Sequence, residues 1–190
     1  MRSKLVLAAL LALVTTPVIA QVAPAAKISG LPLAVGGGLS DFSLDYGPGR
    51  RMLGITAWAD YNVFHGLAIE AEGTSIFADK PAVFTRMKQQ TIKGGLVYKP
   101  HPIFRIRPEV KYLFGLGSVD FPSRDPLYTH DTYTMSAAGG GGEYPVWKNL
   151  YARAEYEYEW WYNYQGPRDL NPNGFTIGAI YYLRGIHRHY

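Results

Sequence analysis

The sequence of 190 residues predicts an all-β protein that forms a closed eight-stranded antiparallel up-and-down transmembrane β-barrel. Eight segments alternate apolar and polar residues with a period of two, as a strand does when its two faces meet different environments. The connections between these segments alternate between short and long, as in outer-membrane barrels. The chain also begins with residues typical of a secretory signal peptide. Together, these three observations favour a protein that crosses a membrane with strands.

Each predicted strand is long enough for the ~9 to 11 residues with which a tilted strand spans a bilayer. In chain order the strands are expected at residues 32–43, 51–62, 66–76, 85–99, 103–117, 132–144, 150–162 and 174–184. The short connections are 63–65, 100–102 and 145–149, and the longer ones are 44–50, 77–84, 118–131 and 163–173. Because the strand number is even, both chain ends lie on the side of the short turns, which is periplasmic in outer-membrane barrels.

The segment 150–162 shows most clearly that the two faces of the predicted wall differ. Arg153, Glu155, Glu157 and Glu159 share one face, and alanine, tyrosine and tryptophan occupy the other. Since an Arg or Lys that faces lipid at mid-membrane costs about 2 to 4 kcal/mol, the charged face must point into the barrel. The same argument, applied to all strands, predicts a lumen ionic network of Glu70, Glu72, Lys93, Arg105, Arg107, Glu109, Lys111, Arg153, Glu155, Glu157 and Glu159.

Five members of this set are basic and six are acidic, so their charges nearly cancel. The lumen of an eight-stranded barrel is only wide enough for side chains to fill, and buried charges need partners. We therefore expect a packed ionic core. The main competing fold is a soluble lipocalin-like barrel, which would expose these charges to water, where near-neutrality is not required. That fold is less favoured.

Aromatic residues near both ends of the strands also indicate a membrane, because rings gather where strands meet the two interfaces. Near the short turns the sequence places Phe64, Tyr98, Phe104, Tyr144, Trp147 and Tyr181. Toward the long loops it places Phe42, Phe77, Phe84, Tyr133, Trp160, Trp161, Tyr162 and Phe175. We expect both groups to form belts on the outer surface.

The start of the chain divides the sequence into a signal peptide at 1–20 and a barrel domain at 21–190. Arg2 and Lys4 precede an apolar run, and a cleavage site fits before Gln21. Without the signal peptide, 17 basic residues face 15 acidic ones, which does not indicate a nucleic-acid partner. The chain has no cysteine, which excludes disulfides, thiolate metal sites and a lipoprotein anchor.

The last predicted strand carries the pattern polar, x, Gly, x, x, aromatic, x, hydrophobic at Thr176, Gly178, Tyr181 and Leu183. With this pattern and the strand arrangement over 28–184, the chain resembles the small OmpA-type and OmpX-type eight-stranded outer-membrane barrels. The resemblance implies a bacterial outer-membrane location in a Gram-negative cell, with outer-membrane lipid and lipopolysaccharide around the barrel. It also implies that the barrel-assembly machinery, which recognises the assembly signal, and periplasmic chaperones are partners.

We expect a structural role in the cell envelope. Two alternatives stay open: a narrow or gated porin-like channel that uses the lumen charges, and a surface adhesion or binding barrel that uses tyrosines near the loops, Tyr46, Tyr128, Tyr162 and Tyr164. We expect no enzyme, because the polar residues of the third long loop, Ser123, Asp125, His130 and Asp131, show no nucleophile held beside an oriented base. We also expect no cofactor, and no metal at His187 and His189.

Overall fold

The computed structural model describes residues 33–45, 51–78, 87–120, 130–164 and 168–183. Within these ranges it contains nine strands and no helix. The strands are β1 (Leu33–Ser43), β2 (Arg51–Phe64), β3 (Leu67–Ala78), β4 (Met87–Tyr98), β5 (Arg107–Asp120), β6 (His130–Trp147), β7 (Leu150–Tyr164), β8 (Arg168–Leu170) and β9 (Asn173–Tyr182). The described residues include no helix that is long and apolar enough to cross a membrane.

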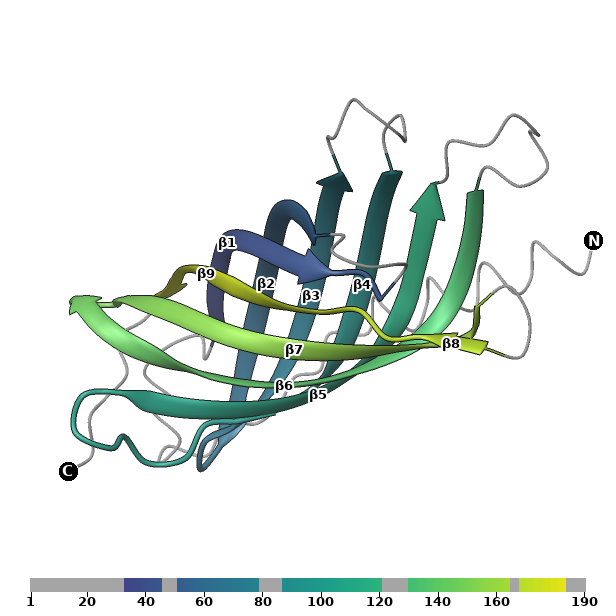
Figure 1. Cartoon of the computed structure of the whole chain (residues 1–190). Coiled ribbons are helices and arrows are strands. Elements are labelled where there is room, and N and C mark those ends of the chain that lie inside the picture. The colour runs from purple at the N-terminus through teal and green to yellow at the C-terminus, as the bar shows by residue number, and fades with distance from the viewer. Residues whose placement is uncertain (1–32, 46–50, 79–86, 121–129, 165–167, 184–190) are drawn as a thin grey trace, which may run out of the picture.

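Eight long strands form a closed antiparallel ring (Figure 1). From β1 to β7 each strand pairs with the next, and β9 closes the ring by pairing with both β7 and β1. The short strand β8 pairs only with the end of β7 and lies outside this ring. The predicted closed eight-stranded barrel is therefore confirmed, with β8 as an addition that the sequence did not predict.

The two faces of the wall differ as the alternation predicted. The outward face is apolar: Leu39, Ile92 and Ile177 expose 74%, 68% and 67% of their surface. The inward face is polar through the middle of the barrel, where Lys93 and Glu155 are buried. A wall of this kind can meet hydrocarbon on the outside, because every strand of the ring has a neighbour on both sides and the charges lie within.

All three short connections differ from the predicted bounds, and the connection between β4 and β5 differs most. β2 and β3 are joined by His65 and Gly66, and β6 and β7 by Lys148 and Asn149. The connection between β4 and β5 is longer than expected, because Ile103 and Ile106 hydrogen-bond to each other and close a small turn before β5 begins. β5 therefore begins at residue 107, four residues later than predicted.

The interior has three levels along the barrel axis. Near the long loops, buried apolar side chains form an outer apolar cluster: Phe42, Leu44, Met52, Ile76, Leu113, Val119, Tyr133, Met135, Ala137, Trp161, Tyr164 and Leu170. Near the short turns lies an inner apolar cluster of Ala34, Trp58, Tyr151, Ile180 and Tyr182. The buried charges occupy the middle level and reach down to the inner cluster.

The outer apolar cluster corrects part of the predicted aromatic belt. Phe42, Tyr133 and Trp161 were expected on the outer surface, but they expose only 2%, 9% and 0% of their surface and lie inside the barrel. Their positions share the inward face of their strands, and near the long loops that face is apolar. Phe77 and Phe175 do lie on the outer surface, with 48% and 56% exposed. Phe84 lies outside the described residues.

Glycine at position 115 is required by the close approach of two strands. A Cβ atom there would overlap the carbonyl oxygen of Ile92 on β4, whereas a Cβ at Gly73 would meet only the carbonyl oxygen of Thr91, at 3.8 Å. We expect Gly115→Ala to lower the free energy of unfolding by about 1 to 3 kcal/mol. The matched variant Gly73→Ala should change it by less than about 0.5 kcal/mol. Urea titration of the refolded barrel in lipid vesicles measures both, and equal effects would contradict this account.

Candidate functional site

The structure gathers ten of the eleven predicted lumen residues into one connected network of ion pairs. The residues of this network come mainly from β3, β4, β5 and β7, whose inward positions face one another across the lumen. The members from the predicted set are Glu70, Glu72, Lys93, Arg107, Glu109, Lys111, Arg153, Glu155, Glu157 and Glu159. We call this group, with the three members added below, the lumen network.

Arg153 on β7 is the centre of the lumen network. Its guanidinium contacts Glu70 at 2.6 Å, Glu155 at 2.7 Å and Glu109 at 2.8 Å, and it approaches Asp60 at 3.4 Å. Its side chain is completely buried. A planar guanidinium with five donors suits this position, because it can contact carboxylates in several directions at once.

Lys111 on β5 continues the network toward the long loops. Its ammonium lies 3.0 Å from both Glu155 and Glu157 and 3.4 Å from Glu70, and it also pairs with Glu72. Two of these carboxylates, Glu70 and Glu155, also contact the arginine at the centre. Shared carboxylates therefore join neighbouring cations into a continuous chain.

Lys93 on β4 forms the upper end of this chain. Its ammonium lies 2.9 Å from Glu72 and 3.0 Å from Glu159, and it pairs with Glu157. Glu159 also accepts a hydrogen bond of 2.8 Å from the indole nitrogen of Trp161. Since Trp161 belongs to the outer apolar cluster, this bond connects the charged level directly to the apolar level above it.

Lys99 lies just after β4 and forms the lower end of the network. Its ammonium contacts both Asp60 and Glu143 at 2.6 Å. Glu143 also accepts a 2.7 Å hydrogen bond from the hydroxyl of Tyr182 and lies 3.4 Å from Arg107. The guanidinium of Arg107 lies 5.5 Å from the ring centre of Tyr182, so the inner apolar cluster covers this end.

Three members of the lumen network were not in the predicted set: Asp60, Lys99 and Glu143. Each lies at an even sequence distance from an inward residue of its own segment, so the alternation of faces, extended to the strand ends, would have found them. Arg105 was predicted wrongly. It is exposed in the turn between Ile103 and Ile106, because β5 begins only at residue 107.

These changes alter the predicted charge balance. Within the described residues the network contains five cations and eight carboxyl groups, a formal charge of −3 instead of the near-neutral set that the sequence suggested. Seven of the eight carboxyl groups contact two cations each, and Glu159 contacts one. Sharing lets five cations serve the larger number of carboxyl groups.

The residues of the predicted assembly signal lie in and just after β9. Thr176 is buried and its hydroxyl lies 3.0 Å from that of Ser40, while Gly178 pairs in register with Gly38 at the β1–β9 seam. Tyr181 and Leu183 expose 45% and 43% of their surface on the outer face. The pattern thus presents an aromatic and an aliphatic side chain outward on the strand that closes the ring.

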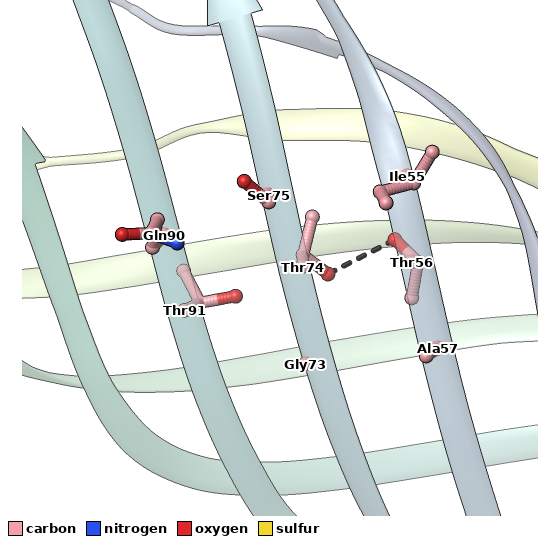
Figure 2. Close-up of a pocket in the computed structure, with 8 residues that line it drawn as sticks. All are labelled: Ile55, Thr56, Ala57, Gly73, Thr74, Ser75, Gln90 and Thr91. Carbon is pink, nitrogen blue, oxygen red and sulfur yellow. Dashed lines mark hydrogen bonds between the residues drawn. The ribbon is translucent and has the colours of Figure 1, made fainter.

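The described residues also form a pocket that contains no charged side chain. Figure 2 shows a pocket on the wall of β2, β3 and β4, formed by residues 55–57, 73–75, 90 and 91, none of which is charged. A 3.0 Å hydrogen bond joins the hydroxyls of Thr56 and Thr74 there. Among the described residues, no group of three or more His, Asp and Glu side chains is arranged to hold a metal ion.

Only some of the polar residues predicted in the third long loop lie within the described residues. Asp131 accepts a hydrogen bond from the hydroxyl of Tyr133 and another of 2.9 Å from the backbone of Thr132, so it is occupied within its own strand. Ser123 and Asp125 lie outside the described residues, as do His187 and His189 in the predicted tail.

A closed antiparallel ring with an apolar outer wall and a charged interior defines a membrane-spanning β-barrel. A family model described as "Outer membrane protein beta-barrel domain" matches residues 6–182. The chain therefore belongs to this family, and the predicted resemblance to small eight-stranded outer-membrane barrels is confirmed. No curated protein matches the sequence.

Solved structures of several bacterial proteins have a similar fold. Neisserial surface protein A (NspA) is 16% identical, with 80% of this chain and 96% of that chain covered and a TM-score of 0.63. Ail of Yersinia pestis, in complex with the heparin analogue sucrose octasulfate, is 17% identical, with 78% and 95% covered and a TM-score of 0.52. The N-terminal β-barrel domain of Pseudomonas aeruginosa OprF is 14% identical, with 80% and 99% covered and a TM-score of 0.50. At these identities the likeness concerns the fold.

The contacts of Arg153 lead to a stability prediction. Arg153→Met removes the positive charge but keeps a side chain of similar length, so four carboxyl groups lose a cation in a site that water does not reach. We expect the free energy of unfolding to fall by about 3 to 5 kcal/mol.

The matched control is Arg51→Gln, because Arg51 forms a 2.9 Å ion pair with Asp41 while 56% of its side chain is exposed. An exposed pair contributes about 0 to 1 kcal/mol, so this variant should unfold close to the wild type in urea. Equal losses in the two variants would show that burial does not set the strength of the network.

Proposed function

We propose that this protein is an integral outer-membrane barrel with a closed lumen and a structural role in the cell envelope. The observation that carries this proposal is the burial of the lumen network. The side chains of Lys93 and Arg153 have no exposed surface, and that of Lys111 exposes 1%. A water-filled channel at these levels would wet the charges that line it, so this interior is suited to holding the barrel together.

The orientation follows from the lengths of the connections. In outer-membrane barrels the short turns face the periplasm and the long loops face outward. On this basis both chain ends face the periplasm, and residues 1–20, which lie outside the described part, are a signal peptide that is removed on export. Outer-membrane lipid and lipopolysaccharide would surround the wall. Periplasmic chaperones and the barrel-assembly machinery would deliver it, and the machinery would recognise Tyr181 and Leu183 at the closing strand. The proposed role is not catalytic.

The location can be tested on cell fractions. The full chain should be found in the outer-membrane fraction, start at Gln21 by N-terminal sequencing, and migrate faster on a gel before boiling than after it. A closed barrel that resists detergent gives this shift, because its backbone hydrogen bonds are all internal. Recovery in a soluble fraction without detergent would contradict the proposal.

The closed lumen can be tested in planar bilayers. We expect the purified, refolded protein to give no steady ionic current, because ion pairs fill the middle of the lumen and the outer apolar cluster covers them. A porin of known conductance is the positive control. A steady current that scales with salt concentration would contradict the closed lumen and favour the channel alternative.

One observation favours a narrow, cation-selective channel as the second candidate. The excess of carboxyl groups gives the lumen network a formal charge of −3, which would attract cations if ion pairs rearranged to open a path. In that case Lys93→Gln with Arg107→Gln should raise cation selectivity and leave the barrel folded. A variant that is only less stable would assign both residues to structure.

The adhesion alternative has weaker support from the described residues. Ail, a similar fold, was solved with a heparin analogue, but its identity to this chain is only 17%. Of the tyrosines near the loops, Tyr162 is 38% exposed, whereas Tyr164 is buried in the outer apolar cluster and is not available to a partner. Tyr46 and Tyr128 lie outside the described residues. Loss of surface attachment, with normal assembly, after shortening residues 121–129 would favour this role.

A further inference from the structure

The three short turns, taken with the strand ends beside them, share a sequence pattern that the barrel itself does not require. Each contains a β-branched aliphatic residue, then an aromatic residue, then a basic one: Val63-Phe64-His65, Ile103-Phe104-Arg105 and Val146-Trp147-Lys148. We call these the rim triplets. His65-Gly66 and Lys148-Asn149 are two-residue turns that begin with the basic residue, whereas the turn Phe104-Arg105 begins with the aromatic residue. The triplets therefore do not occupy one position in a common turn.

The apolar members of the rim triplets face outward. The aromatic residues Phe64, Phe104 and Trp147 expose 61%, 100% and 69% of their surface. The aliphatic residues before them are also exposed, by 46% to 63%. Neither of the buried apolar clusters contains any of these side chains. They therefore add nothing to the interior, and they continue the apolar outer wall to the ends of β2 and β6 and into the turn before β5.

Two of the basic residues lie beside their aromatic neighbours. The ring of His65 meets that of Phe64 edge-on at 5.6 Å, and the ammonium of Lys148 lies 5.9 Å from the ring centre of Trp147. Arg105 is exposed next to Phe104. A cation held beside a ring, as Lys148 is, suits the membrane interface, where the ring meets the acyl boundary and the cation meets the head groups.

The charge of this rim is of one sign. Residues 63–66, 99–106 and 145–149 contain no Asp or Glu. Two basic residues in the described part of the opposite rim have carboxylate neighbours instead: Arg51 pairs with Asp41 at 2.9 Å, and Lys88 is in register with Asp120 on the adjacent strand. Exposed positive charge without acidic neighbours is complementary to an anionic surface.

The backbone gives an independent indication that these side chains are useful. In each turn one triplet residue has a positive φ: 45° at His65, 57° at Phe104 and 24° at Lys148. Glycine or asparagine would relieve the strain of this conformation. Retaining a ring or a charge at all three positions therefore has a cost, which a contact made by the side chain would offset.

From these observations we infer that the rim triplets form a binding surface for the phosphates of anionic phospholipids in the periplasmic leaflet. The aliphatic and aromatic side chains insert at the acyl boundary. The basic side chains contact head-group phosphates at three places around the rim, and this contact holds the barrel at a defined depth. The inference depends on the membrane-spanning fold and on the proposed orientation, in which the short turns are periplasmic, but on neither the closed lumen nor the structural role.

The experiment uses the full chain, refolded in bilayers that contain a trace of spin-labelled phosphatidylglycerol or spin-labelled phosphatidylcholine. Electron paramagnetic resonance gives the association of each lipid with the barrel. We expect the wild type to prefer phosphatidylglycerol by about threefold, since a basic residue near an anionic surface contributes up to about fivefold. Arg105→Gln with Lys148→Gln should reduce the ratio to near one, and high salt should also lower it.

The matched control is Arg51→Gln with Lys88→Gln, which removes the same charge from the opposite rim and should keep most of the preference. Migration before and after boiling shows that each variant is folded, and single Arg105→Gln serves if the double variant is not. A wild type without preference overturns the inference. An equal loss in the control variant also overturns it, because the preference would then follow net charge rather than the rim triplets.

Discussion

The structure depends on keeping all charged side chains of the wall out of lipid, although only a narrow lumen is available to hold them. Closing β9 onto β1 removes the free edges of the sheet, and the outer face can then be apolar throughout the membrane. The charges that remain must pair across the lumen. Because the lumen is narrow, a cation such as Lys111 reaches carboxylates from β3 and β7 at once, and each carboxylate is shared with a second cation.

The faces of the wall could be predicted from the sequence because a strand alternates its side chains with a fixed period of two. That period assigns Glu155, Glu157 and Glu159 to one face wherever the strand begins. The cost of placing a charge in lipid then determines that this face points inward. Strand ends were predicted to within two residues for most strands. The period cannot say where a strand starts, and at Arg105 a local turn closed by Ile103 and Ile106 takes the residue out of the wall.

The sequence also could not show how the interior changes with height. An inward position can hold a charge or a ring. The choice depends on what lies opposite it across the barrel, which is set by strand order, tilt and register together. Trp161 continues the inward face of Glu159, yet it belongs to an apolar cluster with side chains from β1, β5 and β6 that are distant in sequence. Aromatic residues near strand ends are usual in a belt, so Phe42 and Tyr133 were assigned to the outer surface although they belong to this cluster.

The charged and apolar levels strengthen each other. Ion pairs are stronger where the local dielectric is low, and side chains that exclude water from the top of the lumen keep it low around Lys93 and Glu159. In turn, the hydrogen bond from Trp161 to Glu159 fixes the orientation of the largest ring in the outer apolar cluster. Below, the hydroxyl of Tyr182 and the guanidinium of Arg107 join the inner cluster to Glu143 in the same way. A barrel that lost its apolar covers would therefore also weaken its ion pairs, although none of their atoms had been changed.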